Sequence, residues 1–159
     1  MTIREGRPSD RDALVALWSG IEALHARLTP DFFRSPSTDA HAAKQVGSAL
    51  AEAHGRYETL LVADLDGRVL GFVHVALFDT PRSPEMVERR RARIEEVIVA
   101  EAERRRGVGR RLVDGARAWS RQRGAEQIVL TVWSGNADAM LFYRALGFAP
   151  VSQVLGRAP

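Results

Sequence analysis

Apolar residues recur every three or four positions in two long stretches of the chain, which is the spacing of an amphipathic helix. The first stretch follows Pro8-Ser9-Asp10, a typical helix start, and ends before Thr29-Pro30-Asp31; its apolar residues are Ala13, Leu14, Leu17, Trp18, Ile21 and Leu24. The second stretch predicts a helix from Val108 to Arg123, with Gly124 as its terminating residue and with Leu112, Val113, Ala116 and Trp119 on one face. A further helix is predicted over Ser37 to His54 and a short one over Asn136 to Leu146.

The remaining apolar segments are short and rich in β-branched residues, which predicts strands. They cover Thr2 to Glu5, Thr59 to Ala63, Val69 to Phe78, Arg93 to Ala100, Gln127 to Trp133 and Phe148 to Leu155. Asp64-Leu65-Asp66-Gly67 predicts a hairpin turn, and the polar segment from Pro81 to Arg91 predicts a surface loop. The resulting order, β-α-α-β-β-β-α-β-α-β, indicates an α/β (α+β) fold in which helices flank both faces of a mixed central sheet.

Length and composition are those of one ordinary globular domain, which we expect to span residues 1–159. The chain has no cysteine, which excludes disulfides, thiolate metal sites and a cysteine nucleophile. No set of histidine and acidic residues has metal-ligand spacing, so we expect no metal. The first residues include charges, and no apolar run approaches the roughly 18 residues of a membrane span. We therefore expect a cytoplasmic protein with no membrane partner.

Basic residues are concentrated in the middle of the chain. Residues 81–123 contain 13 of the 23 Lys and Arg residues but only 7 of the 20 Asp and Glu residues. This imbalance predicts an anionic partner, either a phosphorylated small molecule or a nucleic acid. A nucleic-acid surface would have aromatic side chains among its basic ones, and residues 81–111 include no aromatic residue. We therefore expect no nucleic acid partner.

Gly107 and Gly109 lie between a predicted strand and a predicted helix, directly after Arg104-Arg105-Arg106. Glycines at such a junction let backbone N–H groups approach an anion, and the helix N-terminus adds its dipole. A tight turn beside a solvated arginine cluster is the simpler alternative. The dinucleotide-binding pattern requires a third glycine where this chain has Leu112, and the Gly-Lys-Ser/Thr of a Walker A loop is absent.

Arg104 to Gly109 also matches the pattern Q/R-x-x-G-x-G/A, and Ile94 to Val113 resembles the core segment of the GCN5-related N-acetyltransferases (GNAT family) in order and spacing. A second segment, Asn136 to Phe148, is similar to the family motif N-x-x-A-x-x-F-Y-x-x-x-G-F. Together with the element order, the resemblance covers nearly the whole chain. It implies an acetyl-CoA-dependent N-acetyltransferase that moves an acetyl group directly to a primary amine in a ternary complex. The acceptor would be a small-molecule or peptide amine.

The resemblance assigns two sets of residues to acetyl-CoA. In the family, a bulge splays the fourth strand from the fifth, so the backbone of Val97, Ile98 and Val99 would hold the pantetheine arm. The glycine loop and the first helical turn would bind the phosphates through Arg104, Arg105, Arg106, Gly107, Val108, Gly109 and Arg110. Asn136 is expected to cap the helix that follows it or to contact the coenzyme.

Transfer to an amine requires a base for the amine and a proton for the leaving thiolate. By resemblance, Tyr143 is the acid near the coenzyme sulfur; packing of its helix against the sheet is the alternative. Glu95 and Glu96 are the candidate bases, and because they are adjacent on a predicted strand we expect them to point to opposite faces. The nine residues from Glu95 to Arg104 resemble the spacing in relatives of spermidine acetyltransferases, which ranks Glu95 first. Glu96 or a water chain is the alternative.

The acceptor side is less well defined. Phe32 and Phe33 lie where the family builds its acceptor wall, between the first two helices, and core packing is their alternative role. His74 alternates with apolar neighbours on its strand and is expected to face a cleft, whereas we expect His25 to be structural. The sequence does not decide between a monomer and the homodimer that is common in the family.

A non-catalytic CoA-binding regulatory module on the same fold is the alternative function. Such a module would be expected to lack Tyr143 and the strand glutamates, and this chain retains all of them. The sequence therefore favours an enzyme.

Overall fold

A single mixed sheet organises the computed structural model, which describes residues 1–35, 38–53, 55–80 and 85–156. Over these residues the sheet has five strands in the order β1-β2-β3-β4-β5, and each strand pairs with its sequence neighbour. The first four are antiparallel, whereas β4 and β5 are parallel. Their bounds are β1 Thr2–Glu5, β2 Glu58–Leu65, β3 Arg68–Asp79, β4 Arg90–Val99 and β5 Gln127–Leu130.

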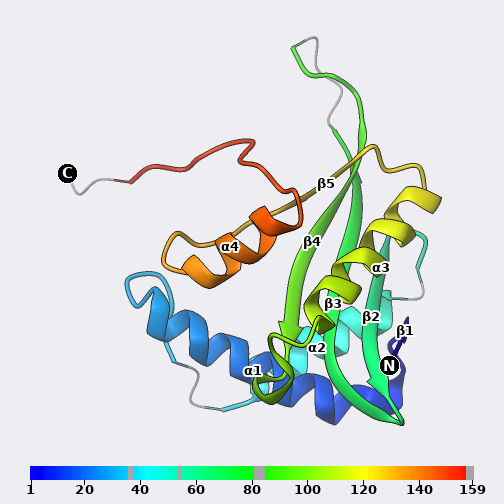
Figure 1. The fold of residues 1–159 in the computed structure, drawn as a ribbon, viewed down its shortest axis with the longest axis vertical. Helices are drawn as coiled ribbons and strands as arrows, with labels where there is room; N and C mark the ends of the chain where they lie inside the picture. Colours follow the sequence, from blue (N-terminus) through cyan, green and yellow to red (C-terminus); the bar gives the residue numbers. More distant parts are fainter. Residues whose placement is uncertain (36–37, 54, 81–84, 157–159) are drawn as a thin grey trace.

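The helices cover both faces of this sheet (Figure 1). On one face lie α1 (Arg11–Leu28) and α2 (Ala40–Glu52), and on the other lies α3 (Val108–Gln122). The short helix α4 (Ala137–Ala145) follows β5, and short 3-10 turns precede α1 (Pro8–Asp10) and α3 (Glu101–Glu103). None of the described helices is long and apolar enough to cross a bilayer.

The core has two parts because strand side chains alternate between the faces of the sheet. Val62 and Phe72 pack with Leu14 and Val46 beneath α1 and α2. Their strand neighbours Leu61 and Val73 pack on the opposite face, beneath α3; the helix contributes Val108, Leu112, Val113, Ala116 and Trp119 to this cluster. The apolar stripe predicted for this helix is therefore its buried face.

The predicted α/β (α+β) class and most of the predicted elements are confirmed. Asn136 caps α4, as its Oδ1 accepts a hydrogen bond of 3.1 Å from the Ala139 N–H. The predicted loop is partly wrong, since β4 already begins at Arg90 and pairs with Asp79. Predicted helix ends at Ser37 and His54, and residues 81–84 of the predicted loop, lie outside the described residues.

Two strand predictions near the C-terminus are wrong. The strand expected from Gln127 to Trp133 ends at Leu130, because the pairing of β5 with β4 stops at the pair Ile94 and Leu130. The strand expected from Phe148 to Leu155 is absent from the described part of the chain, and that segment is irregular. It has no neighbouring strand to pair with, and Val154 is 98% exposed.

Candidate active site

The parallel strands β4 and β5, at one edge of the sheet, separate partway along β4. Beyond Ile94 and Leu130 the described chain forms no further β4–β5 pairs, although β4 continues to Val99. The chain after β5 turns away from β4 and leads to α4 (Figure 1). The edge of β4 from Val97 to Val99 that faces the opening thus pairs with no described strand, and the carbonyl oxygen of Val99 accepts a 3.3 Å hydrogen bond from Nε of Arg104. An extended ligand with amide groups can hydrogen-bond to such an edge.

A cavity of about 160 Å³ occupies this opening. Its lining comes from the end of β5, the start of α4 and the splayed part of β4; it includes Glu95, Glu96, Val97, Leu130, Thr131, Val132, Trp133, Asn136, Ala139 and Tyr143. Candidate catalytic residues that are about 45 positions apart in the sequence therefore face one small space. The splay of the two strands creates that space.

The glycine loop has the backbone geometry of an anion site at the N-terminus of α3. Arg105 and Gly107 have left-handed conformations, with φ of 62° and 81°. Left-handed residues in a turn direct successive N–H groups to one side, and the first N–H groups of a helix have no acceptor within it. The arginine side chains of the loop are mostly solvent-exposed, so their charges remain at the surface. These features fit the phosphates of a coenzyme.

Gly109 is needed for close packing between α3 and α4. A Cβ at this position would lie 3.2 Å from Cζ of Phe142 and 3.7 Å from Cγ2 of Val99. The Phe142 ring in turn contacts Tyr143, with ring centroids 5.0 Å apart. The small residue at 109 thus lets α4 approach the loop and sets where Tyr143 lies.

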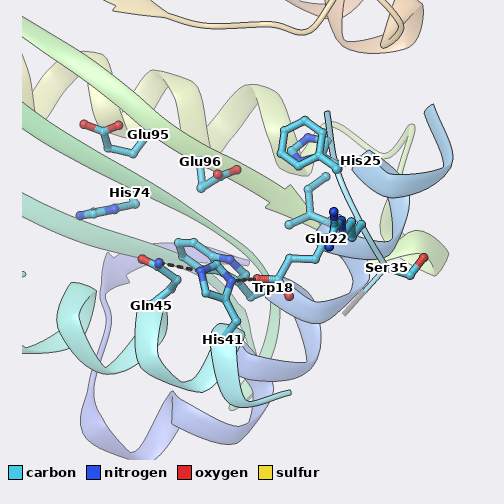
Figure 2. Close-up of a pocket in the computed structure, with 12 residues that line it drawn as sticks. Trp18, Glu22, His25, Ser35, His41, Gln45, His74, Glu95 and Glu96 are labelled. Carbon is cyan, nitrogen blue, oxygen red and sulfur yellow. Dashed lines mark hydrogen bonds and ion pairs between the residues drawn. The ribbon is translucent and has the colours of Figure 1, made fainter. Parts of the chain in front are cut away.

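Glu95 and Glu96 do not point to opposite faces, so that expectation is wrong. His74 pairs with Glu96, whereas Val75 pairs with Ile94, which leaves Glu95 as the extra residue of a β-bulge. The bulge shifts the alternation by one position, so Ile94 packs beneath α3 but Ile98 packs beneath α1 and α2. Both carboxylates therefore face the α1–α2 side (Figure 2).

The two glutamates differ in their surroundings. Glu95 is partly exposed and accepts a 2.7 Å hydrogen bond from Nε of Arg93. Glu96 is largely buried, and burial raises its pKa to about 7, with smaller contributions from the charges of Glu95 and Glu22. Burial also raises the pKa of the Tyr143 hydroxyl, and the Glu96 charge adds to that effect. At neutral pH the tyrosine is protonated and the glutamate is near its midpoint.

A larger cavity of about 730 Å³ adjoins the first, and Ile21, His25, Glu95 and Glu96 line both. Its walls are α1, the segment after α1, α2 and the strands β3 and β4 (Figure 2). In one wall Nδ1 of His41 lies 2.6 Å from Oε1 of Glu22, and Nε2 of Gln45 lies 3.0 Å from Nε2 of His41. The site thus consists of two connected spaces with Glu96 at their junction.

The residues predicted for the acceptor are only partly in this cavity. Phe33 and His74 line it, and Nε2 of His74 lies 3.0 Å from Oε2 of Glu58. Phe32 is 70% exposed and is not part of the lining. It packs against Trp133, with ring centroids 5.0 Å apart.

Several residues of the cavity wall were not predicted as site residues: Trp18, Glu22, His25, His41 and Gln45. Trp18, Glu22 and His25 share one face of α1 at helical spacing, and that spacing was the available signal. His25 was expected to be structural; it lies in both cavity walls, and burial lowers its pKa. Among the described residues, no group of three or more His, Asp or Glu side chains is placed to hold a metal ion.

Known acetyltransferases match this chain in sequence and in structure. The model of the Acetyltransferase (GNAT) family matches residues 21–148. Streptothricin acetyltransferase of Streptomyces lavendulae is 34% identical over 91 residues, which are 57% of this chain but only 44% of that protein. A crystallised mutant of the BH1408 protein of Bacillus halodurans is 25% identical, with a TM-score of 0.90 over 100% of this chain and 99% of the other. An aminoglycoside N-acetyltransferase crystallised with CoA shares the fold at 18% identity, with a TM-score of 0.70 over 99% of this chain and 93% of the other.

The matched residues include the glycine loop, the splayed strands and the Asn136 to Phe148 motif. The family resemblance inferred from the sequence motifs is thereby confirmed. The chain belongs to the acetyltransferase (GNAT) family.

Proposed function

We propose that this protein is an acetyl-CoA-dependent N-acetyltransferase that transfers the acetyl group directly to a primary amine in a ternary complex. One observation carries this proposal: the opening between β4 and β5 and the larger cavity beneath α1 and α2 meet at Glu96. A donor in the first space and an acceptor in the second would have their reacting groups side by side. No cysteine is present to carry the acetyl group between them.

The donor side combines an anion site with an open strand edge. We assign the coenzyme phosphates to the backbone and arginines of residues 104–110, and its pantetheine arm to the backbone of Val97, Ile98 and Val99. The side chains of Val108 and Ile98 are buried in the core, so these two residues would act through their backbone alone. The aminoglycoside N-acetyltransferase of the same fold, crystallised with CoA, supports this assignment.

Acetyl-CoA supplies a thioester whose carbonyl carbon is attacked by the amine nitrogen, and the C–S bond breaks to release a thiolate. We assign Glu96 as the base that takes the proton from the acceptor ammonium. A carboxylate whose pKa is about 7 accepts a proton at neutral pH and returns it to solvent readily. Glu95, ranked first from the sequence, is partly exposed and paired with Arg93, so its surroundings favour it less.

Tyr143 is assigned as the acid that protonates the leaving thiolate. Its hydroxyl lines the smaller cavity, and its raised pKa keeps it protonated throughout the pH range of the reaction. The nitrogen is positively charged after its attack and loses a second proton as the C–S bond breaks; this proton balances the one that Tyr143 gives to the thiolate. Packing against Phe142 and Phe148 holds the ring in place.

We propose a small-molecule amine as the acceptor, because the larger cavity lies between α1 and α2 on one side and the sheet on the other. Its volume is within the range typical of small-molecule sites. The named activities of the related streptothricin acetyltransferase and of the structurally similar aminoglycoside N-acetyltransferase support this class of acceptor.

The test is the pH dependence of amine acetylation by the wild type, Glu96→Gln and Tyr143→Phe. For the wild type, kcat/KM should rise through about pH 7 as Glu96 ionises. Glu96→Gln should lose that rise and fall by about 100-fold at pH 8, the typical contribution of a general base. Tyr143→Phe should lower kcat while the Kd of acetyl-CoA, measured by calorimetry, stays unchanged.

Two results would count against these roles. If Glu96→Gln kept the wild-type profile, Glu96 would not be the base, and the Glu95→Gln variant would be tested next. If the wild type bound acetyl-CoA but acetylated no amine in a broad panel, the protein would be a coenzyme-binding module.

A further inference from the structure

The two sides of the site carry opposite charge. The donor side has the arginines of residues 104–106 and 110, whereas three carboxylates line the larger cavity: Glu22, Glu95 and Glu96. Arg34 is the one Arg or Lys in the described lining, and the lowered pKa of His25 keeps its ring neutral at neutral pH. The acceptor cavity is therefore acidic although the whole chain has a net charge of +3.

The three carboxylates do not have equivalent roles. Glu95 is neutralised by Arg93, whose Nε lies 2.7 Å from it. Glu96 is placed at the junction of the two spaces and is assigned to the reacting amine. Glu22 is on α1, in the wall opposite β4, and it contributes to the electrostatic field at Glu96. Glu22 therefore remains for a second cationic group.

The contacts of Glu22 leave one of its two carboxylate oxygens without a hydrogen-bond donor among the described residues. Its side chain is only 14% exposed, and Oε1 accepts the hydrogen bond of Nδ1 of His41. Nε2 of the same ring lies 3.0 Å from the amide nitrogen of Gln45. Oε2 of Glu22 is enclosed and accepts no hydrogen bond from the described residues.

A buried carboxylate without a cation or a full set of donors costs free energy, and an ammonium group supplies both charge and donors. The wall beside Glu22 also includes Trp18, whose ring stacks on Phe72 with centroids 5.6 Å apart. The charge and the buried position of Glu22 thus favour an ammonium group bound beside it, away from the reacting centre at Glu96.

We propose that the acceptor is a polyamine-type molecule with at least two ammonium groups, and that Glu22 determines this specificity by binding the group that does not react. This inference rests on the proposed transferase function. It assigns Glu96 to the reacting amine and Glu22 to recognition. A monoamine of the same length would leave Oε2 of Glu22 without a partner.

The experiment compares 1,5-diaminopentane with pentylamine as acceptors, since the two differ only in the second amino group. We expect kcat/KM to be at least about tenfold higher for the diamine, the effect of one charge-assisted contact. Glu22→Gln should remove that preference, lowering the ratio of kcat/KM for the diamine to kcat/KM for pentylamine about tenfold. Any change that this variant causes in the pKa of Glu96 acts on both amines alike and leaves the ratio unaffected. Gln retains the shape of Glu and an oxygen that accepts from His41. Asp12→Asn, an exposed charge loss on the same helix, is the matched control and should change neither value.

Calorimetry of diamine binding without acetyl-CoA separates this inference from the transferase proposal. Weaker binding of the diamine to Glu22→Gln than to the wild type is expected. Equal kcat/KM for the two amines, or an equal loss for both in Glu22→Gln, would overturn the role of Glu22 while acetyl transfer stands. Glu22-dependent binding of the diamine without any transfer would instead overturn the proposed transferase function.

Discussion

Glu96 is largely buried, and the proposed reaction requires its carboxylate to be ionised. Burial raises its pKa from the ordinary 4.5 to about 7, and Glu95 and Glu22 add to the shift through their charges. A buried carboxyl group with a raised pKa destabilises the folded protein when it is ionised, because the folded state disfavours the charged form. The stability of the protein should therefore report the same pKa as its activity.

Glu96→Gln should stabilise the protein at high pH. The folded-state pKa is above the unfolded value, so the penalty is absent below about pH 4.5, grows as pH rises to about 7 and is complete above it. We expect the free energy of unfolding of the variant to exceed that of the wild type by about 1–3 kcal/mol at pH 8, with no difference at pH 4.

Urea denaturation at several pH values measures this difference. Glu52→Gln, an exposed carboxylate on α2, is the control and should differ little from the wild type at any pH. If the Glu96→Gln difference did not change between pH 4 and pH 8, Glu96 would not be the strongly shifted group that the proposed mechanism requires.

At the scale of elements, the N-terminus of α3 depends on one glycine conformation. Gly107 has a φ of 81° and immediately precedes Val108, the first residue of the helix. A Cβ there would meet no neighbouring atom within 4 Å, so the constraint is on the backbone and not on packing. The left-handed conformation directs the N–H groups that we assign to the coenzyme phosphates.

Gly107→Ala should therefore weaken acetyl-CoA binding and cost about 1 kcal/mol of stability, since an L-residue is strained at this φ. We expect the Kd of acetyl-CoA, measured by calorimetry, to rise about tenfold. Gly47→Ala is the matched control: this glycine is inside α2 and also has no atom near its Cβ, but its φ is not left-handed. That variant should bind acetyl-CoA normally and be as stable as the wild type or more so. Unchanged binding in Gly107→Ala would show that the loop is not the phosphate site.

The bulge in β4 shows which part of the site the sequence could not predict. Strict alternation places Glu95 and Glu96 on opposite faces, and the register of β4 against His74 and Val75 places them on the same face. That register depends on a strand about 20 residues away, so no local pattern reveals it. The Asn136 cap of α4, by contrast, depends only on residues within one helical turn, and the sequence predicted it.

At the scale of the molecule, the order of elements and both family motifs could be read from the sequence, because each is a local pattern of apolar residues, glycines and caps. The wall of the acceptor cavity could not be read from the sequence, because its residues are known only once the faces of α1 and α2 that lie over the end of the sheet are known. Glu22 and His41, which form one contact across the two helices, are separated by a segment that includes the Thr29-Pro30-Asp31 break. The predicted Phe148 to Leu155 strand failed for the same reason, since a strand requires a partner.

The two proposed substrate sites have side chains of opposite charge. Arginines surround the proposed site of an anionic donor, carboxylates line the proposed site of a cationic acceptor, and the two spaces meet at Glu96. In the proposed mechanism both substrates are bound together, and the chain has no cysteine that could carry the acetyl group between them. The central claim is therefore a direct transfer.

Initial rates of thiol release, with acetyl-CoA and 1,5-diaminopentane both varied, test this claim most directly. Direct transfer in a ternary complex predicts double-reciprocal lines that intersect, and release of thiol that depends on the amine. Parallel lines, with an acetylated protein detected by mass spectrometry before the amine is added, would contradict it.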